Sequence, residues 1–315
     1  MNIAYASDNN FVDVMCVSIM SFNDHNSDAN IYILDCGIEE YNKQKILELC
    51  SGKNTVLFVD AKKVLDGLHY DLNLDRGSIA SYARLFIGSV LPNDVTKVLY
   101  IDSDTLIRGN LNELYNTELN PHIIAGIRDA FSVMNKRVFG IKKGELFINA
   151  GVILIDLEAW RRRNIEDGIY ELLNNKKRIF QGDQGVINTI FHGNVKELPL
   201  KYDVMTYLYD FSYEEMMLYR KPDNYFGKDE IFDAVNDPCI VHFTTSFRSE
   251  RPWNTKGRSS HPYYHSWMGY YRQFASCHTV NDSRKSVAGG WFTLFFVGII
   301  HAYIRPIMYV LSADR

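Results

Sequence analysis

The sequence predicts an α/β fold with a mostly parallel central sheet, and three observations support this. Short apolar runs alternate with helical patterns along the first hundred residues, as in chains that cover a sheet with helices. The runs are continuously apolar, which is typical of parallel strands buried on both faces. The chain has 315 residues and is 46% hydrophobic, so it can bury a substantial core in one large domain or two smaller ones.

The expected elements follow in order along the chain. The first strand covers 3–6 and stops at the polar turn 7–10, after which a helical pattern begins. The later elements carry the same signals of apolar runs and 3.6-residue periodicity. We expect further strands at 31–34, 56–59, 98–101, 145–156 and 240–243, and helices at 39–50, 79–90, 157–174 and 183–191.

Composition and missing motifs argue against several classes of function. The net charge of −4 gives no general case for nucleic-acid binding, so we expect no such partner. The five cysteines are odd in number and lack C-x-x-C spacing, which argues against a disulfide framework or a zinc site and favours a reducing compartment. No basic segment precedes the first strand, so we expect no signal peptide and a cytoplasmic protein. Neither G-x-G-x-x-G nor a Walker A loop occurs, so dinucleotide and P-loop sites lose their main support.

Acidic residues follow two of the predicted strands, where ligands bind in parallel α/β sheets. One is Asp8, and the other begins the segment Asp102-Ser103-Asp104. Side chains two residues apart on an extended chain point the same way, so the two carboxylates of that segment can share one hard cation. A departing nucleoside diphosphate needs such a cation because it gathers negative charge. His242 ends a later apolar run and can complete a manganese site, although a solvated turn and a structural histidine would give the same pattern.

The same Asp-x-Asp pattern also occurs in aspartate-nucleophile phosphatases. Those enzymes typically place a hydroxyl residue two positions beyond the second aspartate. Here Leu106 holds that position and Thr105 comes one residue too early. Downstream, Gly182-Asp183 is not followed by a second aspartate four residues later. We therefore rank a phosphatase below a transferase.

Two further segments contain polar residues in apolar surroundings. Asp183 and Gln184 open the helical pattern near 183, where Asp183 could serve simply as a helix N-cap. Arg84 lies in segment 78–85 among small and apolar residues. An arginine in that position needs an anionic partner, either a structural carboxylate or a bound phosphate or sugar-site acid.

Taken together and in this order, these segments resemble the family 8 retaining glycosyltransferases, such as the enzymes that extend lipopolysaccharide with galactose or glucose. The resemblance covers roughly residues 2 to 255. The segments that carry it are 4–11, 78–85, 98–104, 147–152 and 181–184. It implies a single GT-A type nucleotide-diphospho-sugar transferase domain, followed by a C-terminal helical tail.

The resemblance also implies roles for individual residues at matching positions. Uridine and ribose would be held by Ala6, Asp8 and Asn10, and Mn²⁺ or Mg²⁺ by Asp102, Asp104 and His242. Other donor-binding residues would be Arg84, Ser103, Asn149 and Gly151. Gln184, beneath the anomeric carbon, and Asp183, beside the donor sugar, would carry catalysis. Front-side transfer and a short-lived covalent intermediate both remain open.

The chain departs from the family pattern after its histidine. The family commonly has a glycine and then Lys-Pro-Trp, which closes over the diphosphate. Here the corresponding residues are Arg251-Pro252-Trp253 at a longer spacing. Arginine binds phosphate bidentately and can do the work of that lysine. We prefer Arg251 for this role over Arg248.

The C-terminal part differs in composition from the rest. We expect a catalytic domain at 1–255, an aromatic-rich helical extension at 256–285 and an apolar tail at 286–315. Segment 287–300 carries no charge before Arg305-Pro306 interrupts the apolar run, which is short of the 20 or so residues that span a bilayer. Its aromatic residues and scattered cations favour attachment in the membrane interface, with a packed core helix and a true span as alternatives.

The leading interpretation is a Mn²⁺-dependent transferase that moves glucose or galactose from a UDP-hexose to a hydroxyl group. Its acceptor would be a surface glycan or a lipid-linked saccharide, at the inner face of the cell membrane. The alternatives are a metal-dependent phosphatase and a catalytically silent sugar-nucleotide-binding protein. The presence of Asp102, Asp104, Asp183 and Gln184 argues against a silent protein.

Overall fold

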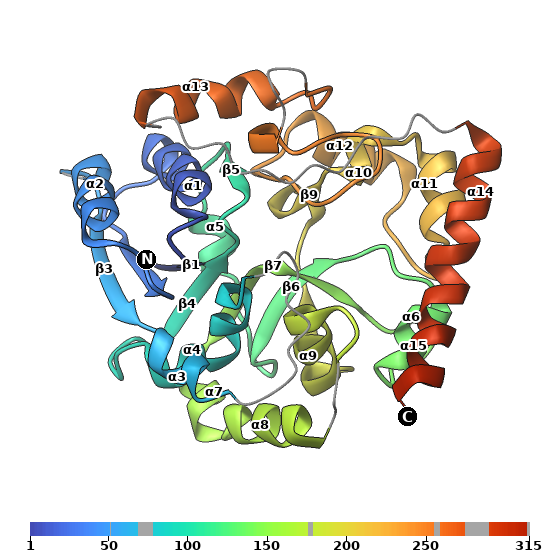
Figure 1. The fold of residues 1–315 in the computed structure, drawn as a ribbon, viewed down its shortest axis with the longest axis horizontal. Helices are drawn as coiled ribbons and strands as arrows, with labels where there is room; N and C mark the ends of the chain where they lie inside the picture. Colours follow the sequence, from blue (N-terminus) through green and yellow to red (C-terminus); the bar gives the residue numbers. More distant parts are fainter. Residues whose placement is uncertain (51, 69–77, 176–178, 255–258, 275–289, 314–315) are drawn as a thin grey trace.

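A seven-stranded sheet runs through the centre of the computed structural model (Figure 1). The structure describes all residues except 51, 69–77, 176–178, 255–258, 275–289 and 314–315. The strands lie in the order β3-β2-β1-β4-β7-β6-β8. Their bounds are β1 Asn2–Ser7, β2 Asn30–Asp35, β3 Thr55–Asp60, β4 Lys97–Ile101, β6 Ile124–Arg128, β7 Ile148–Asp156 and β8 Val195–Glu197.

The sheet is mostly parallel, as the sequence predicts. Strand β7 runs antiparallel to β4 and β6, and the other neighbouring strands pair in parallel. Alternate residues of β1 enter different apolar clusters, with Ile3 and Tyr5 in one and Ala4 and Ala6 in the other. Both faces of the sheet are therefore buried, which explains why its strands are continuously apolar.

Helices cover both faces of the sheet and continue past it to the C-terminus. Their bounds are α1 Val12–His25, α2 Glu40–Cys50, α3 Lys62–Asp66, α4 Ile87–Val90, α5 Asn112–Tyr115, α6 Val133–Val138, α7 Leu157–Arg162, α8 Ile165–Asn175, α9 Gly182–Phe191, α10 Tyr207–Asp210, α11 Tyr213–Arg220, α12 Lys228–Asn236, α13 Tyr264–Phe274, α14 Trp291–Ile299 and α15 Arg305–Ala313. Shorter 3₁₀ segments are η2 Ala80–Phe86, η3 Leu200–Tyr202 and η4 Pro252–Asn254. Residues Ile300–Ile304 form a π-helical turn, η5.

A second, three-stranded sheet lies beyond the carboxyl end of β4. It contains β5 Thr105–Ile107, β10 Ile240–His242 and β9 Val204–Met205, with β10 in the middle. Its register places His242 opposite Thr105 on β5 and Met205 on β9. The last residue of β10 thus lies next to the turn that joins β4 to β5.

Three predicted elements differ from the structure. The helix expected at 79–90 is a 3₁₀ segment followed by a short α-helix, and in the 3₁₀ part Arg84 Nε donates to the carbonyl of Ser81 three residues earlier. The helix expected at 157–174 breaks at Asn164, whose φ of 49° lies in the left-handed region that asparagine tolerates. The strand expected from 145 begins only at Ile148.

The C-terminal helices pack on the α/β body in two places. Helix α13 contacts α1, and its Trp267 is buried in the cluster that holds Trp253 and Val17 (Figure 1). Helix α14, turn η5 and α15 form one continuous helix beside α11 and α6 (Figure 1). Arg305-Pro306, which interrupts the apolar run in the sequence, does not end this helix, because the π turn directly before it accommodates the proline.

Candidate active site

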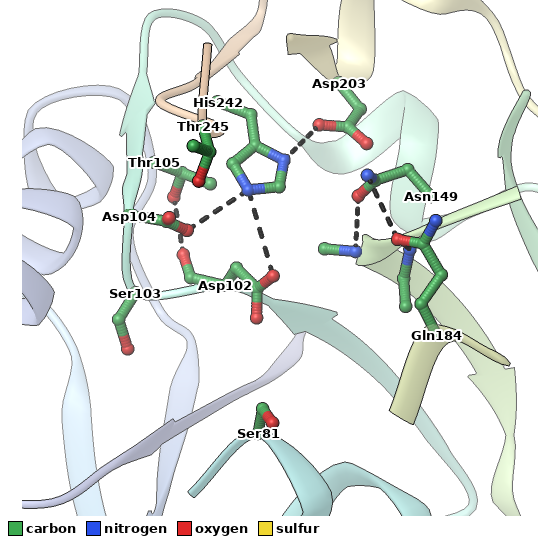
Figure 2. Close-up of polar contacts among 12 residues, drawn as sticks. Ser81, Asp102, Ser103, Asp104, Thr105, Asn149, Gln184, Asp203, His242 and Thr245 are labelled. Atoms are coloured by element: carbon green, nitrogen blue, oxygen red, sulfur yellow. Dashed lines mark hydrogen bonds and ion pairs between the residues drawn. The ribbon is translucent and has the colours of Figure 1, made fainter. Parts of the chain in front are cut away.

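Two aspartates and a histidine meet where β4, β5 and β10 come together (Figure 2). Asp102 directly follows β4, Asp104 directly precedes β5, and His242 is the last residue of β10. Each offers one ligand atom within 4.8 Å of the other two. His242 Nε2 lies 3.1 Å from Asp104 Oδ1 and 3.8 Å from Asp102 Oδ2. These residues form the DxD-type ligand set that their strand-end positions predict.

A third carboxylate holds the other side of the histidine ring. Asp203 has no exposed surface, and its Oδ1 lies 2.8 Å from His242 Nδ1 (Figure 2). Burial lowers the pKa of His242, but the carboxylates of Asp203 and Asp104 outweigh it and hold this pKa well above its usual value. Burial raises the pKa of Asp203, against the opposing effect of His242. Sequence analysis did not find Asp203.

This arrangement fits a divalent metal ion. The two carboxylates and the Nε2 atom supply oxygen and nitrogen ligands of the kind that Mn²⁺ accepts. The Nδ1 hydrogen bond to Asp203 fixes the orientation of the ring, as carboxylates behind metal-binding histidines do. The raised pKa of His242 shows that the carboxylates favour positive charge at this point, which a metal ion would supply in place of a proton.

Arg84 links this cluster to the first turn of α9. Its Nη2 lies 2.6 Å from Asp102 Oδ1, and its Nε lies 3.0 Å from Asp183 Oδ2. The guanidinium also donates to the carbonyl of Ala150 and stacks 4.4 Å from the ring centroid of Tyr100. The partners that buried Arg84 requires are therefore two carboxylates of the candidate site.

Asp183 lies inside the first turn of α9 and is not its N-cap. The N-cap residue is Gln181, with φ 63° and no side-chain cap hydrogen bond. Burial raises the pKa of Asp183, although Arg84 acts in the opposite direction. The capping explanation that the sequence allowed is therefore wrong for this aspartate.

The start of β7 supplies amide groups to the same place. Gln184 Oε1 accepts from the Ala150 amide at 3.3 Å and from Asn149 Nδ2 at 3.4 Å (Figure 2). Gly151 donates to Asn149 Oδ1 at 2.7 Å, and its carbonyl accepts from the Asp102 amide at 2.7 Å. A Cβ on Gly151 would collide with the ring of His242, so this close approach requires glycine.

The residues expected around the nucleotide follow the carboxyl end of β1. Ser103 Oγ donates to the carbonyl of Ala6 at 2.9 Å. Asp8 accepts from the Asn10 amide at 3.0 Å and from Ser78 Oγ at 2.8 Å. The side chain of Asn10 is exposed. The β4–β5 turn thus lies against the end of β1, where the sequence predicts the donor site.

The two candidate arginines after β10 have different neighbours. Arg251 is buried, with its Nη2 3.6 Å from Asp104 Oδ2 and 2.9 Å from Thr245 Oγ1. Arg248 instead pairs with both carboxylate oxygens of Glu215, at 2.9 and 3.1 Å. Its guanidinium stacks on Phe211 at 4.4 Å. Of the two, the structure places Arg251 beside the metal ligands.

A further polar cluster behind Gln184 was missed by sequence analysis. Gln184 Nε2 donates to Asp129 Oδ2 at 3.2 Å. The other oxygen of Asp129 accepts from Arg220 at 2.8 Å and from the Tyr207 hydroxyl at 3.1 Å. Asp129 directly follows β6, as Asp102 follows β4, but the apolar run of β6 contains Gly126 and ends in a charged residue, so the sequence gave no strand signal there. Arg220 and Tyr207 lie in helices and carry no such signal.

Comparison with known proteins identifies the family of this chain. The family model described as Glycosyl transferase family 8 matches residues 2–257. General stress protein A of Bacillus subtilis is 24% identical over 287 residues, which cover 86% of this chain and 93% of that protein. Lipopolysaccharide 1,2-glucosyltransferase of Escherichia coli is 26% identical over 269 residues, which cover 81% and 73%.

A solved structure gives the same fold. The galactosyltransferase LgtC, in complex with donor and acceptor sugar analogs, superposes with a TM-score of 0.69 at 24% identity, covering 88% of this chain and 98% of that one. The architecture is therefore that of GT-A glycosyltransferases, as expected. Because the family model matches most of its length, this chain belongs to glycosyl transferase family 8 and is an enzyme of the hexosyltransferase class.

Proposed function

We propose that this enzyme transfers glucose or galactose from a UDP-hexose to a hydroxyl group of a surface glycan or a lipid-linked saccharide. The observation that carries the proposal is that Arg84, beside the three candidate metal ligands, forms ion pairs with both Asp102 and Asp183. A diphosphate held at the ligands would bring its sugar toward this arginine and toward Gln184. The names of two similar proteins, a lipopolysaccharide glucosyltransferase and a galactosyltransferase, support these hexoses and this class of acceptor.

In this proposal the donor lies along the carboxyl ends of β1 and β4 and the amino end of β7, which runs antiparallel to β4. The residues that hold its nucleotide are Ala6, Asp8, Asn10 and Ser103, and those that hold its sugar are Arg84, Asn149, Gly151 and Asp183. Gln184 faces the same space from α9, with its amide oxygen held by the Ala150 amide. We propose that the configuration at the anomeric carbon is retained, as the family resemblance implies.

The diphosphate that leaves the donor sugar gathers negative charge, so the site needs positive charge beside it. A divalent ion bound by Asp102, Asp104 and His242 supplies electrostatic stabilisation to the departing diphosphate. We propose Mn²⁺, with Mg²⁺ as the second candidate, because one ligand is a nitrogen. Arg251 adds a fixed positive charge next to Asp104. Buried surroundings strengthen both interactions.

The phosphatase alternative loses support in the structure. Such an enzyme would need an available hydroxyl group beside the second aspartate. Thr105 is fully buried, donates to the Asp102 carbonyl at 2.9 Å and shares a 2.7 Å hydrogen bond with Ser18 Oγ. Its hydroxyl group is therefore committed to the fold.

We further propose that the enzyme works on the cytoplasmic face of the cell membrane, with its last helix in the interface. Residues Trp291–Ser312 form a helix long and apolar enough to cross a membrane by length and composition, and 22% of its most apolar window is buried in the protein. Its outward side exposes large apolar residues, including Phe292 at 83% and Met308 at 60%. An interfacial helix with one packed side suits this pattern better than a span. Equal partitioning of wild type and a Phe292→Ser/Met308→Ser variant between anionic liposomes and buffer would remove this part of the proposal.

The test of the transferase site is a substitution at a metal ligand. Asp104→Ala should abolish Mn²⁺-dependent UDP release from the preferred UDP-hexose while leaving the thermal unfolding curve of the protein close to that of wild type. Its side chain serves the ligand set rather than the apolar core. Turnover that keeps the wild-type dependence on Mn²⁺ would exclude Asp104 from the site.

A further inference from the structure

The C-terminal helix packs closely on the helix that leads to Arg220. Its buried side repeats every fourth residue, as Leu294, Gly298, Ala302 and Pro306. A Cβ on Gly298 would lie 2.7 Å from the carbonyl oxygen of Leu218 and 3.0 Å from that of the next residue. The backbones of α14 and α11 are therefore in direct contact near the end of α11 (Figure 1).

The π turn of this helix is held by the segment around α6. Pro306 has no amide hydrogen, so the carbonyl group of Ala302 lacks its usual donor. The carbonyl group of His301 lacks its usual donor too, because in the π turn the Arg305 amide donates to the Ile300 carbonyl instead. Ser132 Oγ donates to the Ala302 carbonyl at 2.8 Å, and Asn135 Nδ2 donates to the His301 carbonyl at 3.2 Å. The irregular turn and its two outside donors fix the position of His301 on the protein.

His301 in turn contacts Arg220. Its Nε2 lies 3.3 Å from Arg220 Nη1. Burial, with added effects of Arg220 and Arg305, lowers the pKa of His301 to about 3. The ring is thus neutral at physiological pH and accepts a hydrogen bond from the guanidinium.

The three nitrogens of Arg220 have three different partners. Besides His301, its Nε donates to the Ala130 carbonyl at 3.0 Å and its Nη2 to Asp129 Oδ1 at 2.8 Å. Asp129 then holds the amide nitrogen of Gln184 through its other oxygen. A continuous chain of contacts therefore joins the C-terminal helix to the residue expected beneath the anomeric carbon.

We propose that the C-terminal helix positions the active site: His301 orients Arg220, and Arg220 orients Gln184 through Asp129. His301 is a positioning residue, and the proposal rests on the proposed transferase function. A carboxamide can rotate by 180° and exchange its oxygen and nitrogen. The chain from His301 selects the orientation in which nitrogen faces Asp129 and oxygen faces the Ala150 amide.

The test uses full-length variants of His301 and of a second, exposed histidine. His301→Ala removes the acceptor for Arg220, and His301→Gln keeps an acceptor near the position of Nε2. His265→Ala makes the same change at an exposed histidine of α13 and is the matched control. The measurements are kcat and KM for UDP release from the preferred UDP-hexose in detergent, and the Kd of UDP by calorimetry.

We expect His301→Ala to lower kcat by about tenfold, the order of effect for a residue that acts through others, with KM and the Kd of UDP unchanged. His301→Gln should recover most of the loss, and His265→Ala should match wild type in kcat. An unchanged kcat in His301→Ala, or equal losses in the alanine and glutamine variants, would overturn the proposal.

A second readout does not depend on turnover. Amide hydrogen exchange in segment 181–185 should be faster in His301→Ala than in His265→Ala, because Gln184 loses its fixed partner. Equal exchange in both variants would overturn the positioning role even if wild type released no UDP. A wild type without UDP release would by itself refute the proposed function instead.

Discussion

The Nδ1 atom of His242 lies 2.8 Å from Oδ1 of Asp203, a carboxylate with no exposed surface. This hydrogen bond fixes the orientation of the imidazole ring, so that its Nε2 atom points toward Asp102 and Asp104. The metal site therefore depends on a residue that is not itself a ligand.

The first prediction concerns this carboxylate. Asp203→Asn should weaken Mn²⁺ binding by about 10- to 100-fold, the usual cost of losing a carboxylate behind a metal-binding histidine. Calorimetric titration with Mn²⁺ measures the effect. Asp129→Asn is the control, because it changes a buried aspartate that contacts Gln184 rather than His242. Equal Mn²⁺ affinity in both variants would contradict the role of Asp203.

A second prediction follows from the contact between β7 and the histidine ring. In Gly151→Ala, the new Cβ would collide with His242 and lie 2.8 Å from Asn149 Oδ1. We expect loss of Mn²⁺ binding and destabilisation by about 1–3 kcal/mol, as for other overpacked sites. Thermal unfolding and metal titration check both effects. Gly269→Ala meets open space in α13 and should leave Mn²⁺ binding intact.

The third prediction separates the two arginines after β10. Arg251→Ala should weaken UDP binding in the presence of Mn²⁺ by about 10- to 100-fold, as expected for a lost charge-assisted hydrogen bond of 1.5–3 kcal/mol. Arg248→Ala should mainly lower thermal stability, because its partner is Glu215. UDP titration of both variants measures the difference. A larger loss of UDP affinity in Arg248→Ala would reverse the assignment.

The sequence predicts those parts of the site that are local to one segment. Asp102 and Asp104 flank the turn after the apolar strand β4. His242 ends the apolar strand β10, and the antiparallel pairing of β10 with β5 brings it to the two aspartates. Asp203 could not be found this way, because it precedes a strand of only two residues, β9. Asp129 was missed since the apolar run of β6 contains Gly126 and ends in a charged residue, so it gave no strand signal.

Helix continuity was also difficult to predict. Pro306 carries a local signal for a helix end, but Ser132 and Asn135 donate to the two carbonyl groups that have no donor within the helix. At Asn164 the reverse happens. The periodic pattern predicts one continuous helix, but the helix breaks because Asn164 adopts a positive φ. At both positions, whether the helix continues depends on tertiary hydrogen bonds or on one residue's backbone conformation, which the periodic pattern does not contain.

The fourth prediction concerns acid stability. Burial lowers the pKa of His261 to about 4 from the ordinary value of 6.5. The unfolded chain takes up a proton near pH 6.5 and the folded protein only near pH 4, so this residue stabilises the fold fully above pH 6.5 and progressively less below it. His261→Gln should make the fall in unfolding free energy between these pH values shallower by up to about 1.4 kcal/mol per pH unit. Chemical denaturation at several pH values measures the slope, and His25→Gln at an exposed position is the control. A slope identical to wild type in His261→Gln would contradict the buried neutral imidazole.

The most direct test of the transferase site is UDP release from a panel of UDP-sugars, with and without Mn²⁺, by the full-length protein in detergent. The site of Asp102, Asp104 and His242 beside Arg84 and Gln184 predicts slow, Mn²⁺-dependent release of UDP from UDP-glucose or UDP-galactose even without an acceptor. The same release rate with and without Mn²⁺, or no release and no binding of UDP at any Mn²⁺ concentration, would contradict the account.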